Sequence, residues 1–240
     1  MRKAFAIAVV LGFAATVAQA ADKRWCSGVS ESSGDDTLRI ARIASKAPRV
    51  HFVSNPGDTE KTRDCPSAAA PCRERAFLVP GDEVLVDEVE GDFACVSFVS
   101  NRVAETGGWI PRDAIETLPV QPVPRPQDWP GTWKRIEATI KLKLRDGKVE
   151  AEGEAVWGSR DPVRVRNGAV HSGGFDGTAA PEGNRLAFGE GYSVKDFPDR
   201  NKSDCQVLLR HFGRYLVVED NQHCGGANVS FSGIYVRAGR

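Results

Sequence analysis

A run of alternating apolar residues in the second half of the chain constrains the fold most strongly. Apolar side chains stand at every second position: Ile136, Ala138, Ile140, Leu142 and Leu144. This is the period of a strand that buries one face. Asp146-Gly147 follows, and this pair is a strong signal for a two-residue hairpin turn. The alternation then resumes at Val149, Ala151, Gly153, Ala155 and Trp157. The pattern predicts an antiparallel hairpin.

The rest of this half also reads as short strands separated by turns. Further strands are predicted at 163–166, 169–175, 184–190, 204–212, 214–219 and 229–237. Helical periodicity is almost absent. Because closure removes exposed sheet edges, a meander of this size is best closed as a barrel. We therefore predict an antiparallel, roughly eight-stranded β-barrel domain over residues 129–240.

A proline-rich stretch at 119–128 marks the clearest boundary in the chain. Its prolines exclude a helix interior or a central strand and favour extended geometry, so we predict a linker there. Before it, five strands are predicted at 49–53, 76–79, 83–89, 93–99 and 107–111. Five short strands in this span predict a small barrel over residues 48–118, preceded by a leader segment at 21–47. The fold class is all-β.

The N-terminus has the organisation of a secretory signal peptide. Arg2 and Lys3 precede an apolar run over 4–17, and Ala18-Gln19-Ala20 is a small-x-small cleavage pattern. The run is too short to span a bilayer, which disfavours the alternative of an uncleaved anchor. Removing residues 1–20 takes two basic residues from 32, leaving 30 against 32 acidic ones. We predict a periplasmic or secreted protein that binds no nucleic acid and has no stable membrane insertion after cleavage.

The six cysteines are expected to form disulfides, because an even number in an exported chain matures in an oxidising compartment. With a turn at Gly213-Arg214, position 205 faces 222, so a Cys205–Cys224 bond requires the chain after 222 to bend back. Cys65–Cys72 with Cys26–Cys95 is the favoured pairing of the other four, and two other connectivities remain open. The alternative is a zinc site formed by Cys205, His211, His223 and Cys224. Its spacing matches no familiar pattern, so no metal is predicted.

Residues 48–118 resemble bacterial SH3-like domains. The passage around Gly81-Asp82 with Val84, Leu85 and Val86 carries this resemblance, together with Gly108-Trp109-Ile110-Pro111, which is similar to that family's closing strand. The resemblance implies a small barrel. The cysteine-bearing insert at 55–75 departs from the short loop of the family and puts an inherited ligand groove in doubt.

The second half carries two weaker resemblances. Gly131-Thr132-Trp133 is similar to the Gly-x-Trp signature of lipocalin- and avidin-like barrels, in which a tryptophan packs under a basic residue of the last strand. This implies structural roles for Trp133 and Arg237, joined by a cation–π contact. The passage from Cys224 to Tyr235 resembles the ending of a group of uncharacterised exported proteobacterial proteins.

No catalytic constellation can be recognised in the sequence. Gly-x-Ser-x-Gly, phosphate-binding loops and dinucleotide fingerprints are absent, and no cofactor is predicted. The leading hypothesis is a non-catalytic binding protein, with an inhibitor-like role included, whose partner is a cell-wall component or an envelope protein. Phe93, Phe98 and Trp109 would line a shallow groove for it, or form the core of the first barrel.

Two other functions remain open. The first is a small-ligand carrier, with its cavity lined by Ile140, Leu142, Trp157 and Phe188; a filled barrel interior would refute it. The second is an unfamiliar envelope hydrolase, which requires that histidines such as His171, His211 and His223 meet carboxylates in one pocket.

Overall fold

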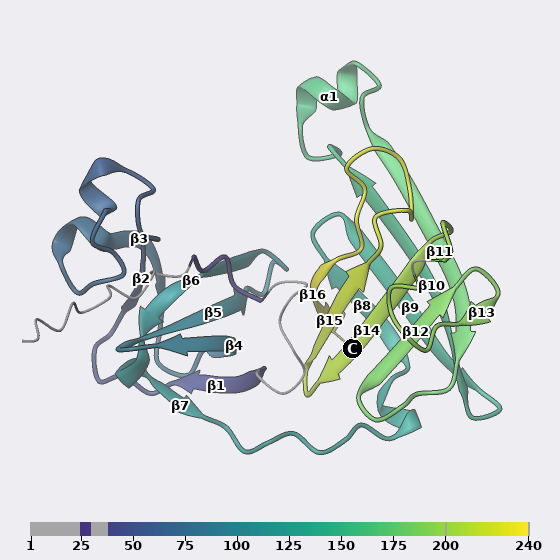
Figure 1. The fold of residues 1–240 in the computed structure, drawn as a ribbon, viewed down its shortest axis with the longest axis horizontal. Helices are drawn as coiled ribbons and strands as arrows, with labels where there is room; N and C mark the ends of the chain where they lie inside the picture. The colour runs from purple at the N-terminus through teal and green to yellow at the C-terminus, as the bar shows by residue number, and fades with distance from the viewer. Residues whose placement is uncertain (1–24, 30–37, 200, 240) are drawn as a thin grey trace, which may run out of the picture.

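The computed structural model describes residues 25–29, 38–199 and 201–239. The predicted signal peptide lies outside these residues. The described chain is all-β: it forms two antiparallel sheets and contains one short α-helix (Figure 1). None of its helices is long and apolar enough to cross a membrane.

The first sheet has seven strands in the order β3-β2-β6-β5-β4-β1-β7. They are β1 Arg39–Ile43, β2 Val50–Val53, β3 Arg73–Leu78, β4 Glu83–Glu90, β5 Phe93–Val99, β6 Glu105–Pro111 and β7 Ile115–Thr117. The five predicted strands correspond to β2 to β6. The prediction missed β1 and β7, which pair with each other at the sheet edge, and β1 lies inside the predicted leader segment. Part of that leader therefore belongs to the first sheet.

The second sheet has nine strands in the order β11-β10-β9-β8-β16-β15-β14-β12-β13. They are β8 Gly131–Arg135, β9 Ala138–Arg145, β10 Lys148–Trp157, β11 His171–Ala179, β12 Arg185–Gly189, β13 Tyr192–Ser193, β14 Gln206–Phe212, β15 Tyr215–Asp220 and β16 Gly233–Arg237. The two ends of the sheet pack against each other, so the sheet is nearly closed as a barrel. Gly177 on β11 makes this approach possible, because an added Cβ would lie 2.8 Å from the Phe188 Cβ on β12.

Two predicted strands of this half are wrong in part. The apolar alternation from Ile136 is broken at Glu137, whose φ is 60°, and β8 and β9 pair across this tight turn. Residues 163–166 are not a strand but belong to α1 Pro162–Arg166. Asp161 caps this helix by accepting the Val163 N–H at 2.8 Å, and Pro162 occupies its first turn. These local signals override the β propensity of valine.

The Asp146-Gly147 hairpin is confirmed. Arg145 pairs with Lys148, and both turn residues have positive φ, 50° for Asp146 and 77° for Gly147, as a type I′ turn needs. The turn at Gly213-Arg214 is confirmed as well, because Phe212 pairs with Tyr215.

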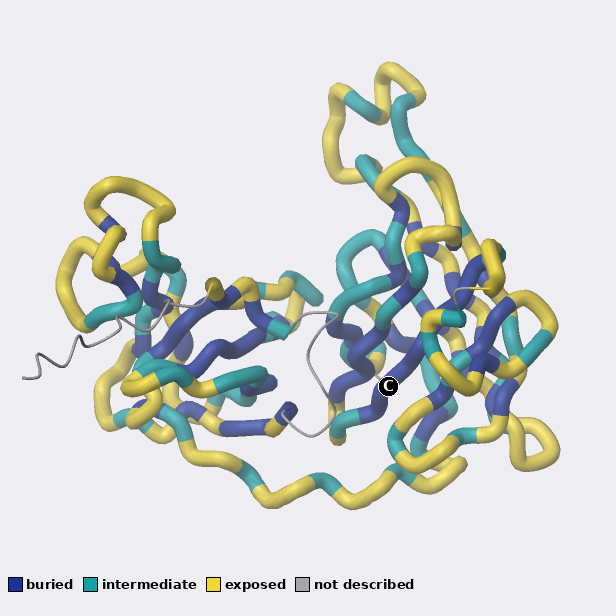
Figure 2. The backbone as a smooth tube through the Cα atoms, in the orientation of Figure 1, coloured by how far each residue is buried: buried dark blue, intermediate teal, exposed yellow. Residues whose placement is uncertain are grey.

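Hydrophobic burial differs between the two sheets. In the second sheet, residues from nearly all strands form one continuous cluster, while the first sheet has a separate core of its own (Figure 2). A further cluster joins the sheets: Leu38, Ile40, Leu85 and Val99 from the first pack against Tyr215, Val217 and Ile234 from the second. The Tyr215 hydroxyl donates to the backbone oxygen of Glu83 at 3.0 Å across this contact.

All three disulfide predictions are confirmed: Cys26–Cys95, Cys65–Cys72 and Cys205–Cys224. The last bond forms as the register requires, because the chain turns back after β15, where Gln222 has a φ of 63°. The described residues contain no free cysteine, which excludes the zinc alternative at Cys205 and Cys224. Three disulfides indicate an oxidising, extracytoplasmic compartment.

Candidate functional site

A cleft of about 780 Å³ lies where the two sheets meet the proline-rich segment. Between β7 and β8, residues 118–125 have no regular secondary structure, and the segment runs along the molecule as the long lower connection in Figure 1. The lining comes from three parts of the chain: Ser100 and Asn101 after β5; Gln121, Pro122, Val123, Pro124, Gln127 and Asp128 from the proline-rich segment; and Trp133, His211, Gly213, Arg214, Val236 and Arg237 from the barrel. A site built from all three parts depends on the complete fold.

Aromatic rings and a guanidinium form the floor of the cleft. The His211 ring lies edge-on to Trp129 and Trp133, with 5.3 Å between ring centroids in each pair. Arg237 pairs with Trp133 between β16 and β8, and its Cζ lies 4.7 Å from the indole centroid. The predicted cation–π contact is thus confirmed. Arg237 also donates to the backbone oxygen of Asp128. This bond links β16, the last strand of the barrel, to the segment just before β8, its first strand.

His211 is buried. Burial and the neighbouring Arg237 guanidinium both lower the pKa of its imidazole. Its Nε2 atom has no hydrogen-bond partner among the described residues. The Asp128 carboxylate is occupied elsewhere, because it accepts hydrogen bonds from Arg125, which lower the pKa of Asp128. The Asp128 carboxylate is therefore bound to Arg125 and is not placed to orient the His211 imidazole as a base.

Hydrogen-bond donors dominate the polar part of the lining. Arg214 and Arg237 contribute guanidinium groups, and Asn101, Gln121 and Gln127 contribute side-chain amides, while Asp128 is the one carboxylate among the described residues of the lining. Pro122, Pro124, Val123 and Val236 add apolar surface, and Val123 is 67% exposed. This arrangement suits an elongated ligand that is rich in carbonyl or carboxylate oxygens.

The aromatic residues predicted for a groove in the first domain lie in its cores or pack against them. Trp109 is fully buried among Cys26, Cys65, Cys72 and Cys95, so it cannot line a surface groove. Phe93 packs against this same cluster, and Phe98 packs against the core of the first sheet. The core alternative therefore describes Trp109, whereas Phe93 and Phe98 are half-buried and Phe98 also lines a surface pocket with Arg102 and Arg214.

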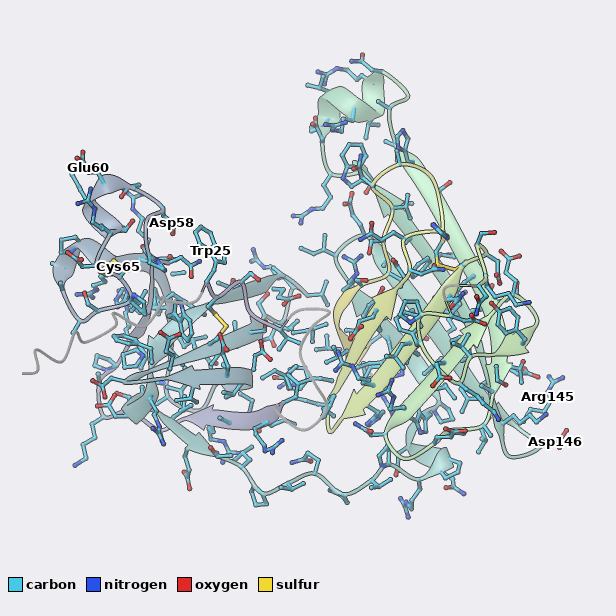
Figure 3. The ribbon with its side chains drawn as sticks, viewed as in Figure 1. Trp25, Asp58, Glu60, Cys65, Arg145 and Asp146 are labelled. Atoms are coloured by element: carbon cyan, nitrogen blue, oxygen red, sulfur yellow. A yellow bond between two sulfur atoms is a disulfide. The ribbon has the colours of Figure 1, made fainter. Side chains whose placement is uncertain are left out.

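Trp25 is the most exposed aromatic among the described residues of this region, and the sequence analysis did not single it out. It is 61% exposed and lies beside the loop that carries Asp58 (Figure 3). Its neighbour Cys26 is fixed to that loop, because Asn55 accepts the Cys26 N–H at 2.8 Å and donates to its carbonyl at 2.9 Å. Trp25 directly precedes Cys26, and the disulfide of Cys26 holds this part of the chain in place. The sequence analysis did not use that adjacency.

The four cavity candidates lie in a filled barrel interior. Ile140, Leu142 and Phe188 are buried in the large cluster, and Trp157 packs against its edge. Phe188 stacks on Phe175 at a centroid distance of 5.9 Å, and Phe175 meets Phe231 edge-on at 4.8 Å. These rings occupy the centre that a carried ligand would need, which leaves the carrier hypothesis without structural support.

The histidines of the hydrolase hypothesis lie in different surroundings. His211 lines the cleft, whereas His171 packs on Trp157 near α1, with its Nδ1 2.6 Å from the Ala227 oxygen. His223 is exposed and follows the bend after β15. Among the described residues, no three side chains of histidine, cysteine, aspartate or glutamate are grouped to hold a metal ion.

The residues that line the cleft were mostly missed from sequence. Asn101 and Arg214 lie in turns and Gln127 in a short 3-10 helix, far apart in the chain, and no spacing pattern connects them. Comparison with protein-family models, with curated proteins and with solved structures finds no match for this chain.

Proposed function

We propose that this chain is an exported, non-catalytic binding protein that holds a cell-envelope component in the cleft between its sheets. The component is a peptidoglycan fragment, a peptide or a segment of an envelope protein. The observation that carries the proposal is the lining of the cleft, where guanidinium and amide donors surround an apolar strip. Cell-wall peptides and glycans present carbonyl, carboxylate and hydroxyl oxygens that such donors bind.

The place of the cleft also supports a recognition role. A ligand there contacts the loop after β5, the proline-rich segment and the end of the barrel at once. The resemblance of residues 48–118 to SH3-like domains suggests that the first sheet is the recognition domain. In our proposal the proline-rich segment serves as both linker and wall of the site. The periplasm, or the medium after secretion, is the proposed location, in keeping with the three disulfides.

The proposal is tested by co-sedimentation of the chain with purified peptidoglycan and by affinity capture from an envelope extract. We expect retention by at least one of them. Replacing Asn101 and Gln127 together by alanine removes two donors from exposed side chains of the cleft. This should weaken binding by roughly tenfold, because each hydrogen bond contributes about 0.5–1.5 kcal/mol.

A matched control is the pair of alanine substitutions at Lys46 and Lys148, which are exposed and do not line the cleft. These changes should leave binding unaltered. Failure of the unmodified chain to bind either material would contradict the proposal. Equal binding by the Asn101 and Gln127 variant would contradict the assignment to this cleft.

A further inference from the structure

The hairpin between β10 and β11 carries a projecting tip that the binding cleft does not use. Residues 158–168 form this tip, which contains α1 and extends beyond the body of the barrel (Figure 1). Nearly all of it is exposed (Figure 2). We call residues 158–168 the finger.

Hydrogen bonds, an ion pair and a cation–π contact order the finger. Glu137 accepts the Ser159 hydroxyl at 2.6 Å and the Arg160 N–H at 3.2 Å, which fixes the base of the finger to the turn between β8 and β9. Asp161 caps α1 and lies 3.4 Å from the Arg164 guanidinium. Arg164 in turn stacks on Trp157, with its Cζ 4.1 Å from the ring centroid. These contacts hold the finger in one conformation.

Two apolar side chains are presented at the tip of this framework. Val163 is 54% exposed and Val165 is 53% exposed, and neither belongs to a hydrophobic cluster of the described chain. The polar contacts above hold the finger without them. Two exposed valines need no partner by themselves, but beside the arginines of the finger they give its tip both apolar surface and positive charge.

The charge of the finger is positive. It contains Arg160, Arg164 and Arg166 against the single Asp161. Asp161 is already engaged by Arg164 and the helix N–H groups. Arg160 and Arg166 are exposed, and within the described residues neither side chain forms an ion pair. The rest of the mature chain carries an excess of acidic residues, so this positive charge is local.

We infer that the finger docks the protein on the surface of an anionic phospholipid bilayer. Val163 and Val165 enter the boundary between headgroups and acyl chains, while Arg160 and Arg166 contact the lipid phosphates. Apolar side chains flanked by arginine match such a surface in both polarity and charge. The attachment is peripheral and reversible, because two valines bury little apolar area, and it leaves the cleft free for its ligand.

The test is flotation of the chain without its signal peptide on vesicles of phosphatidylethanolamine mixed with phosphatidylglycerol. We expect binding that falls as salt is raised, and little binding to phosphatidylcholine vesicles. Arg160→Glu with Arg166→Glu should lower the partition coefficient by at least about tenfold, since each basic residue near an anionic surface is worth roughly fivefold. Val163→Ser with Val165→Ser should lower it several-fold while leaving the charge intact.

The matched control is Lys46→Glu with Lys148→Glu, which changes net charge equally at exposed sites away from the finger. It should bind vesicles to within about twofold of the unmodified chain, since exposed charges beyond a Debye length of the surface are screened. Circular dichroism confirms that each variant is folded. Absent or salt-insensitive binding of the unmodified chain overturns the inference. An equal loss of vesicle binding in the control also overturns the inference, because it shows that binding depends on the net charge of the protein and not on the finger.

Discussion

The two sheets of this molecule are stabilised by different means. In the first, the core divides into two smaller clusters, and one of these is built around Trp109 and both disulfides of the region. In the second, one continuous cluster fills the barrel. Its single disulfide joins Cys205, just before β14, to Cys224, in the bend after β15. Cross-links therefore concentrate where the hydrophobic core is small.

This difference follows from how burial grows with size. A short chain buries a smaller fraction of its surface and gains less from packing, so small exported domains depend on covalent links. The first sheet also leaves β3 and β7 at open edges, whereas the barrel brings its ends together at Gly177. The comparison predicts that the first sheet is sensitive to loss of cross-links and the second to loss of packing.

The largest effect is expected from removing the longest-range cross-link. Replacing Cys26 and Cys95 by alanine opens a loop with a sequence separation of 69. The chain-entropy relation gives about 4 kcal/mol for such a loop. We expect the free energy of unfolding to fall by this amount in urea titrations of the unreduced variant, followed by circular dichroism.

Removing either of the other two disulfides should lower the free energy of unfolding by less. Their sequence separations are 19 for Cys205–Cys224 and 7 for Cys65–Cys72, which correspond to about 3 and about 2 kcal/mol in the same relation. If removing Cys205–Cys224 costs more than removing Cys26–Cys95, the first sheet does not depend on its cross-links more than the barrel does.

A smaller effect is expected from disturbing the closure of the barrel. In Gly177→Ala the new Cβ meets the Phe188 Cβ at 2.8 Å and its Cγ at 2.9 Å, atoms too close to the backbone to move freely. Overpacking of this kind costs about 2 kcal/mol. Gly174→Ala on the same strand is the control, because its Cβ meets only the Gly153 oxygen, at 3.3 Å. Equal unfolding free energies for the two variants would show that the barrel ends are not tightly packed.

Features encoded locally were predictable from the sequence. The Asp146-Gly147 turn needs two residues that accept positive φ, and the sequence supplies them at that point. The pairing of Cys205 with Cys224 followed from the strand register together with the oxidising compartment. Trp133 and Arg237 came from a short resemblance, and the barrel places them at paired positions.

Features that depend on tertiary placement were not predictable. Residues 163–166 are a different case, because Asp161 and Pro162 are local helix-start signals that the strand prediction did not weigh against the two valines. Trp109 was a candidate for ligand binding on its residue type alone. The structure buries it against two disulfides, which the sequence does not place next to it. The cleft brings together Asn101, Gln127 and Arg214 only through the packing of one sheet on the other. No local pattern contains that information.

The smallest effect concerns the seam between the two regions, where His211 lies under the proline-rich segment. Burial and Arg237 lower the pKa of His211 in the folded protein, whereas the unfolded chain titrates near 6.5. The unfolded state therefore binds more protons as the pH falls below about 6.5, and the folded state loses stability there, by at most about 1.4 kcal/mol per pH unit. Above that pH the contribution is fully present.

The measurement is the unfolding free energy between pH 5 and 8, roughly the range in which histidine changes charge. His211→Gln keeps a polar side chain at this position but removes the titration, so its profile should be flatter than that of the unmodified chain. Equal slopes for the His211 variant and the unmodified chain would mean that the imidazole is hydrated. The seam would then be more open than the packing of Trp129 and Trp133 around His211 implies.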